Sequence, residues 1–225
     1  MGSDIKDKTV FLEFYGLPGS GKSTISHLVA EELRRKGKIV AEPTYDTDHR
    51  YSRNVRRGIK LLRLIRYVLY NPRKYKELCK QIRTNGYTGT EVLLQAANIT
   101  PKLWEYDHAK ADFVIFDEGL TQSAIALSAN KGGNSENERF LYDLCQQRSV
   151  RKLYINVTPE TALSRMVGRD KHDSRIEKIK DKVVQYNVLK VFETKCENTT
   201  GKRIDGLCSI KEIITKILAE TENDL

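Results

Sequence analysis

Short apolar runs alternate with longer segments of helical periodicity along most of the chain. Three runs, Val10–Tyr15, Asp112–Asp117 and Leu153–Val157, are nearly continuously apolar, which is typical of strands buried on both faces of a parallel sheet. Two more β-rich runs lie at Lys38–Glu42 and Lys202–Asp205. Strands that alternate with amphipathic helices predict an α/β fold in three layers, because right-handed crossovers return each helix to a face of the sheet.

One long region interrupts this alternation. From Thr44 to Lys110 the pattern is helical throughout, and Asn-Pro and Asn-Gly pairs divide it into several helices. We interpret it as a helical insertion between the second and third strands. The pattern leaves open whether the insertion covers the sheet or forms a separate lobe. No repeat or linker divides the chain, so residues 1–225 are expected to form a single domain.

The composition argues against two classes of protein. Of the 225 residues 39% are hydrophobic, which is enough to fill a core and unlike a disordered chain. The most apolar stretch, Leu61–Tyr70, is interrupted by Arg63 and Arg66 and therefore does not span a membrane. Four scattered cysteines and the absence of a signal peptide pattern predict a cytoplasmic protein with reduced thiols.

The segment Gly16–Ser23 matches the phosphate-binding pattern GxxxxGK[ST] at every defining position. It follows an apolar strand and opens a helix predicted over Lys22–Lys36, which is the context that the motif requires. Glycines let consecutive backbone N–H groups turn inward around a phosphate, and the helix N-terminus adds partial positive charge. Lys22 is expected to contact the β- and γ-phosphates of ATP, and the Ser23 hydroxyl to bind Mg²⁺. The predicted nucleotide-binding residues are Gly16, Pro18, Gly19, Ser20, Gly21, Lys22, Ser23 and Thr24.

A second metal ligand is predicted where the third strand ends. Phe113–Asp117 is an apolar run that finishes in a carboxylate, the pattern that supplies an aspartate to the Mg²⁺ shell beside a phosphate-binding loop. Many buried strands end in an aspartate at a turn, so the prediction depends on the loop that begins at Gly16. We therefore predict that Ser23 and Asp117 together bind the metal.

The remaining signals favour a kinase over a GTPase. The base-reading motif Asn-Lys-x-Asp has its nearest match at Asn130–Gly133, which lacks the aspartate. A kinase needs basic residues that cover the transferred phosphoryl group, and after the fourth strand Arg165 and Arg169 share one helix face. Arg175 follows, and we predict a lid over residues 165–175 that closes over the phosphoryl group and excludes water. A solvated, charged helix end is the alternative interpretation.

Several motifs occur in the order found in one group of phosphate-binding-loop (P-loop) kinases. The motifs are Gly16–Thr24, Glu42-Pro43, Pro159–Leu163 leading to Arg165, and Asp173–Glu177. With them the chain resembles the thymidylate kinase and deoxynucleoside kinase group from about Val10 to Leu218, although weakly across residues 44–110. The resemblance implies the P-loop NTPase fold with a five-stranded parallel sheet and Mg-ATP as donor. It further implies a lid at 165–175 and an insertion on the acceptor side, and members of this group often dimerise through such inserted helices.

The resemblance also assigns a catalytic base. In the nucleoside kinases of this group, the glutamate of the Glu-Pro pair accepts the proton of the acceptor hydroxyl, which places that role on Glu42. This position is physically reasonable, because ligands bind at the carboxyl ends of parallel strands. Two alternatives stay open: Glu42 is a turn or capping carboxylate before Pro43, or Asp117 and Glu118 act as the base pair.

Three positions depart from the thymidylate kinase pattern. Ala41 stands where an arginine precedes the Glu-Pro pair, Pro18 replaces an acidic loop residue, and Glu118 replaces an arginine after the strand-end aspartate. In thymidylate kinases these positions help to bind the acceptor phosphate. Thymidylate is therefore not the expected acceptor, and the acidic Glu118 favours a neutral, hydroxyl-bearing substrate over a phosphorylated one.

The positive charge of the chain is concentrated in the insertion. The 39 Lys and Arg residues outnumber the 30 Asp and Glu residues, for a formal net charge of +9. Between Arg50 and Arg83 only Glu77 is acidic, so this segment alone carries +11 and the rest of the chain −2. The twelve basic residues are Arg50, Arg53, Arg56, Arg57, Lys60, Arg63, Arg66, Arg73, Lys74, Lys76, Lys80 and Arg83. The overall basicity is therefore local, and no specific nucleic acid partner is predicted.

The first half of this basic segment has the pattern of one amphipathic helix. At about 100° per residue its basic and apolar positions fall on opposite sides. The basic side carries Arg53, Arg56, Lys60 and Arg63, and the apolar side carries Val55, Ile59, Leu62, Ile65 and Leu69. Three interpretations compete: a solvated basic face whose apolar side packs on the protein, a helix on an anionic membrane surface, or a site for an anionic polymer.

Together these features predict a cytoplasmic, Mg-ATP-dependent kinase of the nucleoside or nucleotide type with a small-molecule acceptor. The predicted catalytic residues are Lys22, Glu42, Arg165, Arg169 and Arg175. Two alternatives of other classes stay open. One is a nucleotide-switched binding module, and the other is a membrane- or polymer-associated ATPase that docks through its basic helix.

Overall fold

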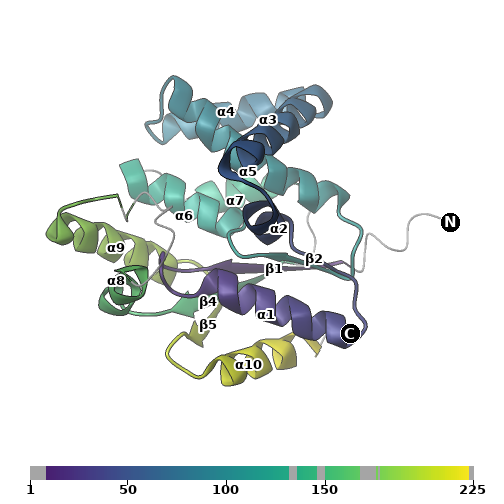
Figure 1. Ribbon diagram of the computed structural model, residues 1–225. Coiled ribbons are helices and arrows are strands. Elements are labelled where there is room, and N and C mark those ends of the chain that lie inside the picture. The colour runs from purple at the N-terminus through teal and green to yellow at the C-terminus, as the bar shows by residue number, and fades with distance from the viewer. Residues whose placement is uncertain (1–8, 132–135, 146–149, 168–175, 177, 223–225) are drawn as a thin grey trace.

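The protein is described by a computed structural model that covers residues 9–131, 136–145, 150–167, 176 and 178–222 (Figure 1). Five parallel strands form one sheet in the order β2-β3-β1-β4-β5. The strands are β1 (Val10–Tyr15), β2 (Val40–Ala41), β3 (Phe113–Phe116), β4 (Val150–Asn156) and β5 (Lys202–Asp205). The predicted α/β fold with a five-stranded parallel sheet is confirmed.

The strand boundaries differ from the predicted ones where burial differs. β2 is shorter than predicted because it lies at the edge of the sheet, where Ile39 is 66% exposed and outside the strand. β4 begins at Val150, earlier than predicted, because its first half includes the half-buried Arg151 and Lys152. Apolar periodicity therefore located the buried parts of the strands and missed the parts with polar side chains.

Ten helices are described around this sheet. They are α1 (Lys22–Arg35), α2 (Pro43–Arg50), α3 (Arg53–Tyr70), α4 (Pro72–Thr84), α5 (Thr90–His108), α6 (Leu120–Lys131), α7 (Asn137–Asp143), α8 (Pro159–Val167), α9 (Lys182–Glu197) and α10 (Ile210–Glu222). Within the ranges that the structure covers, none of these helices combines the length and apolar character needed to cross a bilayer.

Alternate residues of the central strand face different helical layers. Leu12 and Phe14 share a core with α1 and α10 on one face of the sheet. Phe11 belongs to a second core on the opposite face, formed with α3 to α7 (Figure 1). A parallel sheet covered on both faces buries every residue of its central strand, and this explains the continuous apolar run at Val10–Tyr15.

The insertion is entirely helical and packs on the sheet. The chain forms α2 to α5 between β2 and β3, as predicted. Tyr106 of α5 stacks on Phe11 of β1, with ring centroids 4.5 Å apart, and on Phe116 of β3, with centroids 5.2 Å apart. Buried residues of α3, α4 and α5 belong to the same core as these strand residues. The insertion therefore covers one face of the sheet and does not form a lobe with a separate core.

The helix α3 is oriented differently from the simplest expectation. One of the three interpretations had its apolar side pack on the protein, but Leu62 is 68% exposed and Leu69 is 74% exposed. The buried positions of α3 are Leu64 and Tyr67, which pack against α4 and α5. Arg63 lies on the inward side, with a guanidinium nitrogen 3.4 Å from the Thr47 hydroxyl. Long basic side chains extend beside a buried leucine and reach polar groups at the rim, so the basic side can face the protein.

Candidate active site

The loop between β1 and α1 has a backbone that only glycine adopts without strain. Gly19 has φ 92° and Gly21 has φ 94°. A Cβ atom on Gly19 would lie 2.4 Å from the carbonyl oxygen of Ala162 in α8, and one on Gly16 would lie 2.5 Å from that of Ile155 in β4. The loop therefore packs closely against both neighbouring elements. Gly16 and Gly19 are required by contact as well as by conformation, and Gly21 by conformation alone.

Replacing Gly19 by alanine is expected to destabilise the protein by about 3 kcal/mol or more, because the substitution combines backbone strain with a clash. Gly37→Ala is the matched control. Gly37 also has a positive φ, 80°, but an added Cβ meets no atom within 4 Å, so only the conformational cost of about 1 kcal/mol remains. Denaturant unfolding of both variants measures the difference, and equal losses would contradict the close fit of the loop.

The interior of the loop has the groups that bind phosphates. Lys22 is 5% exposed, and its Nζ donates to the carbonyl oxygens of Gly16 at 3.0 Å and Leu17 at 2.9 Å. The Ser20 hydroxyl is buried and has no hydrogen-bond partner within the described residues. Gly21 precedes α1, and its lack of a side chain leaves the helix N-terminus without a side-chain cap. A buried cation, a free hydroxyl and an uncapped helix N-terminus fit the phosphate chain of a nucleotide.

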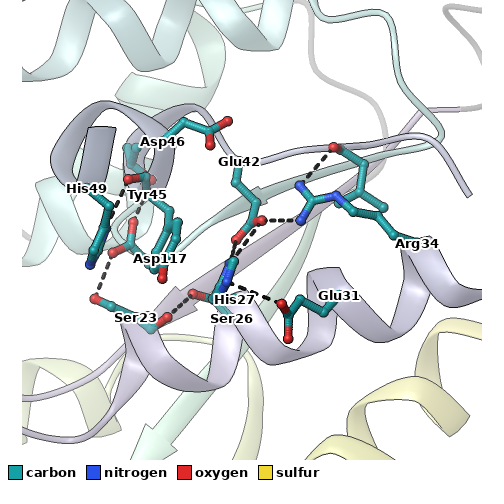
Figure 2. Close-up of polar contacts among 12 residues, drawn as sticks. Ser23, Ser26, His27, Glu31, Arg34, Glu42, Tyr45, Asp46, His49 and Asp117 are labelled. Atoms are coloured by element: carbon teal, nitrogen blue, oxygen red, sulfur yellow. Dashed lines mark hydrogen bonds and ion pairs between the residues drawn. The ribbon is translucent and has the colours of Figure 1, made fainter. Parts of the chain in front are cut away.

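The predicted metal ligands lie side by side. The Ser23 hydroxyl in the first turn of α1 donates to Asp117 Oδ2 at 2.7 Å, although the two residues are 94 positions apart (Figure 2). Asp117 follows β3 and is 7% exposed, and its Oδ1 accepts a second hydrogen bond from the Thr44 hydroxyl of α2. Carboxylate and hydroxyl oxygens are ligands that Mg²⁺ accepts, and one or two protein ligands suffice when phosphates provide the others. These residues therefore fit a magnesium site beside the loop.

The Glu42 carboxylate is held by two basic side chains of α1. Glu42 is 2% exposed, and its Oε2 lies 2.7 Å from the Arg34 guanidinium. Its Oε1 lies 3.1 Å from His27 Nδ1, and His27 Nε2 lies 3.7 Å from Glu31 (Figure 2). The two contacts compensate the burial of the carboxylate and fix its orientation. Positions 27, 31 and 34 lie on one face of α1, a polar stripe that the sequence displays and that we did not assign.

Three aromatic rings form a stack that starts at the Glu42 carboxylate. The Tyr45 ring stacks on His27, with centroids 4.0 Å apart and planes 9° apart, and on His49 at 3.8 Å. The stack begins at His27, which contacts Glu42, and continues through Tyr45 to His49 (Figure 2). Burial and the charge of Glu42 raise the pKa of Tyr45 above its usual range, so the phenol stays neutral at physiological pH. The stack gives the site a flat aromatic wall next to its acidic groups.

A buried glutamate positions the segment that follows β3. Glu13 of β1 is 0% exposed and accepts hydrogen bonds from the backbone N–H groups of Leu120 at 2.7 Å and Thr121 at 2.9 Å. The Tyr106 and Tyr142 hydroxyls also donate to it. Four hydrogen-bond donors and the partial positive charge at the N-terminus of α6 compensate the cost of burying the Glu13 carboxyl group. Glu13 thus fixes the start of α6 and, with it, the loop that contains Asp117.

A lysine of the insertion lies on the other side of this loop. Lys102 of α5 donates to the Ser123 hydroxyl at 2.7 Å and to the Gly119 carbonyl oxygen at 3.2 Å. Burial lowers the pKa of Lys102, and the neighbouring carboxylates of Glu118 and Glu13 oppose that shift. The sequence offered no signal for this residue, because Lys102 is one of many lysines until the fold places it beside the strand end.

The predicted lid is only partly described. Arg165 of α8 donates to the carbonyl oxygen of Ser20 at 3.2 Å and to that of Gly206 at 3.0 Å. It therefore joins the phosphate-binding loop to the turn after β5. Arg169 and Arg175 lie outside the described residues. The predicted loop residues Pro18 and Thr24 are accessible, Pro18 partly and Thr24 fully.

Comparison with known proteins identifies the fold. Neither a protein-family model nor a curated protein matches the chain. Among solved structures, a deoxyadenosine kinase from M. mycoides with dCMP and dCDP bound is similar over 96% of this chain and 100% of that one, with 15% identity and a TM-score of 0.55. The same enzyme with dATP matches with 19% identity, 95% and 100% coverage, and a TM-score of 0.53.

A YorR protein of Bacillus subtilis, solved with phosphorylated GDP, is also similar, with 17% identity, coverage of 96% of this chain and 97% of that one, and a TM-score of 0.52. At these identities the likeness establishes the fold alone. The resemblance to deoxynucleoside kinases that the motifs indicate is thus confirmed for the fold, over nearly the whole length of the chain.

Proposed function

We propose that this protein is a Mg-ATP-dependent phosphotransferase of the nucleoside or nucleotide kinase type that acts on a hydroxyl group of a small molecule. The observation that carries the proposal is the meeting of Lys22, Ser23 and Asp117 at the carboxyl ends of β1 and β3, where ligands bind in open parallel sheets. Similar folds bind dATP and deoxynucleotides, which supports the same class of ligand here.

The roles of the loop residues follow from their positions. Lys22 and the N-terminus of α1 would hold the phosphates, and Ser23 and Asp117 would hold Mg²⁺. ATP supplies the γ-phosphoryl group. The reaction forms a bond between the acceptor oxygen and the γ-phosphorus, breaks the bond to the bridging oxygen of ADP, and releases the hydroxyl proton to a base. Arg165, with Arg169 and Arg175 of the proposed lid, would neutralise charge on the transferred group.

Glu42 is the base that we propose. Its carboxylate is oriented by Arg34 next to the metal ligands, and His27 is in contact to share the proton that it accepts. Asp117 is already engaged by the Ser23 and Thr44 hydroxyls. The Glu118 side chain is exposed, whereas Glu42 is oriented by Arg34 and His27. We therefore give Glu118 a role in binding a neutral acceptor and not the role of base.

Glu42→Gln is expected to lower kcat at least about hundredfold, with a much smaller change in the KM for ATP, because the amide keeps its volume and cannot accept the proton. Steady-state kinetics with saturating acceptor measure this. Glu32→Gln is the matched control, since Glu32 lies on the same helix and forms an ion pair with the exposed Arg35. A normal kcat in Glu42→Gln together with a hundredfold loss in Glu118→Gln would transfer the role of base to the Asp117 and Glu118 pair.

The acceptor is found by a screen of ADP release over nucleosides, nucleotides, sugars and amino alcohols. We expect one nucleoside-like hydroxyl compound to raise the rate of ADP release strongly, since the acceptor side presents an acidic Glu118 and the aromatic wall of Tyr45. Slow ATP turnover that no acceptor changes would instead favour a nucleotide-switched binding module.

A further inference from the structure

The helix α3 presents a broad apolar face to solvent. The exposed residues of this face are Val55 at 49%, Leu61 at 52%, Leu62 at 68%, Ile65 at 47% and Leu69 at 74%. On a wheel of about 100° per residue they fall within an arc of about 120°. The only other members of that arc are Asn54 and Gly58, so it contains no charged side chain. We call these five residues the α3 apolar face.

Basic residues border this face. Arg57 and Arg66 lie at its two edges on α3, and the Arg66 guanidinium is stacked 4.2 Å from the centre of the Trp104 ring of α5. On the adjacent α4, Arg73, Lys76, Lys80 and Arg83 are exposed at the spacing of one helix face. In Figure 1 α3 and α4 form the layer farthest from α1 and α10, on the opposite side of the sheet. The two helices thus expose an apolar face with arginines at its edges on α3 and a row of cations on α4.

We propose that this surface docks on an anionic lipid membrane, with α3 lying along the interface. An amphipathic helix with exposed leucines and a border of Lys and Arg inserts its apolar side between lipid headgroups, while the cations contact their phosphates. Complementary charge is essential to this docking, and it comes from exposed cations of α3 and α4. These are Arg57, Arg66, Arg73, Lys76, Lys80 and Arg83. The proposal is independent of the proposed kinase activity.

Two other occupants fit the surface less well. A nucleic acid backbone would satisfy the cations, but it offers nothing that removes Leu62 and Leu69 from water. A second copy of the chain would cover the leucines, but across α3 it would bring two strongly basic segments together, and like charges in contact oppose association. An anionic bilayer satisfies the apolar and the basic parts together.

Flotation of the full chain with vesicles tests the proposal. We expect binding to mixed vesicles of phosphatidylcholine and phosphatidylglycerol, no binding to pure phosphatidylcholine, and weaker binding as salt is raised. The double variant Leu62→Ser/Leu69→Ser should lower the partition coefficient at least about tenfold. The matched control is Val183→Ser/Leu207→Ser, which alters residues 69% and 60% exposed in α9 and before α10, and should bind as the natural chain does.

Four results would overturn the proposal. The first is absence of binding to the mixed vesicles, and the second is equal binding by both double variants. The third is a dimer in vesicle-free solution that Leu62→Ser/Leu69→Ser dissociates, which would make the α3 apolar face an interface between two copies. The fourth is binding to single-stranded RNA, but not to vesicles, that is unchanged in this variant. Vesicle binding by Lys22→Ala should remain normal, which separates this result from the outcome of the kinase assays.

Discussion

Lys22→Ala is expected to lower kcat/KM for phosphoryl transfer at least about thousandfold. The substitution removes the buried cation of the phosphate-binding loop, where the ammonium contacts two loop carbonyl oxygens and where a phosphate chain would lie. No other described lysine donates to the carbonyl oxygens of Gly16 and Leu17, so we expect no substitute for its charge within that part of the chain. In a site with little water, a positioned charge is worth far more than one at the surface.

Coupled ADP-release kinetics with saturating acceptor measure the effect. Lys211→Ala, which changes an exposed lysine of α10, serves as the control and should retain full activity. Thermal unfolding shows whether Lys22→Ala is folded, and addition of ATP should raise the Tm of the natural chain more than that of the variant. A Lys22→Ala protein that is folded and retains a tenth of the activity would contradict the role given to the loop.

Asp117→Asn is expected to lower kcat by about hundredfold and to raise the Mg²⁺ concentration needed for half-maximal activity at least about tenfold. The amide oxygen can still accept a hydrogen bond from Ser23 or Thr44, so the local structure should persist. The negative charge that attracts the metal is lost. The defect is therefore expected in metal dependence and not in folding.

A Mg²⁺ titration at fixed ATP tests this, with Asp143→Asn as the control because Asp143 is an exposed residue of α7. Mn²⁺ should restore part of the activity, since it binds nitrogen and weaker oxygen ligands more readily than Mg²⁺ does. If the Mg²⁺ titration of Asp117→Asn matched that of the natural chain, Asp117 would be a structural partner of Ser23 alone.

The central strand, the phosphate-binding loop and the strand-end aspartate could be predicted, because in these segments the local sequence pattern agrees with the tertiary structure. The apolar run Val10–Tyr15 is buried on both faces in the centre of the sheet, and the loop after it has positive φ at the glycines that the motif requires. Asp117 was predicted to lie beside Ser23 because an apolar strand that ends in a carboxylate supplies a metal ligand next to a phosphate-binding loop, and the two side chains are 2.7 Å apart.

The supporting residues could not be predicted in the same way. Glu13 interrupts an apolar strand, and only the positions of α6 and Tyr106 show that four donors meet there. Lys102 became a site residue because α5 packs across the end of β3. In both cases the partner is about 20 to 130 residues away, and no local periodicity encodes it.

The orientation of α3 shows the limit of the amphipathic pattern. The pattern located the helix and separated its two sides, but it left open whether the apolar side packs on the protein or faces another partner. The structure buries Leu64 and Tyr67 and leaves Leu62 and Leu69 in solvent. A hydrophobic stripe identifies the side of a helix that seeks burial, and it does not say whether the partner is the same chain, another molecule or a membrane.

The most direct test of the proposed function is the stoichiometry of its products. The purified chain is incubated with Mg-ATP and the acceptor found in the screen, and ADP, inorganic phosphate and the phosphorylated acceptor are quantified by mass spectrometry and ³¹P NMR. A kinase that uses Lys22, Ser23 and Asp117 as proposed forms ADP and phosphorylated acceptor in equal amounts, with little inorganic phosphate. ADP formed together with an equal amount of inorganic phosphate, and no phosphorylated acceptor from any compound of the panel, would contradict it.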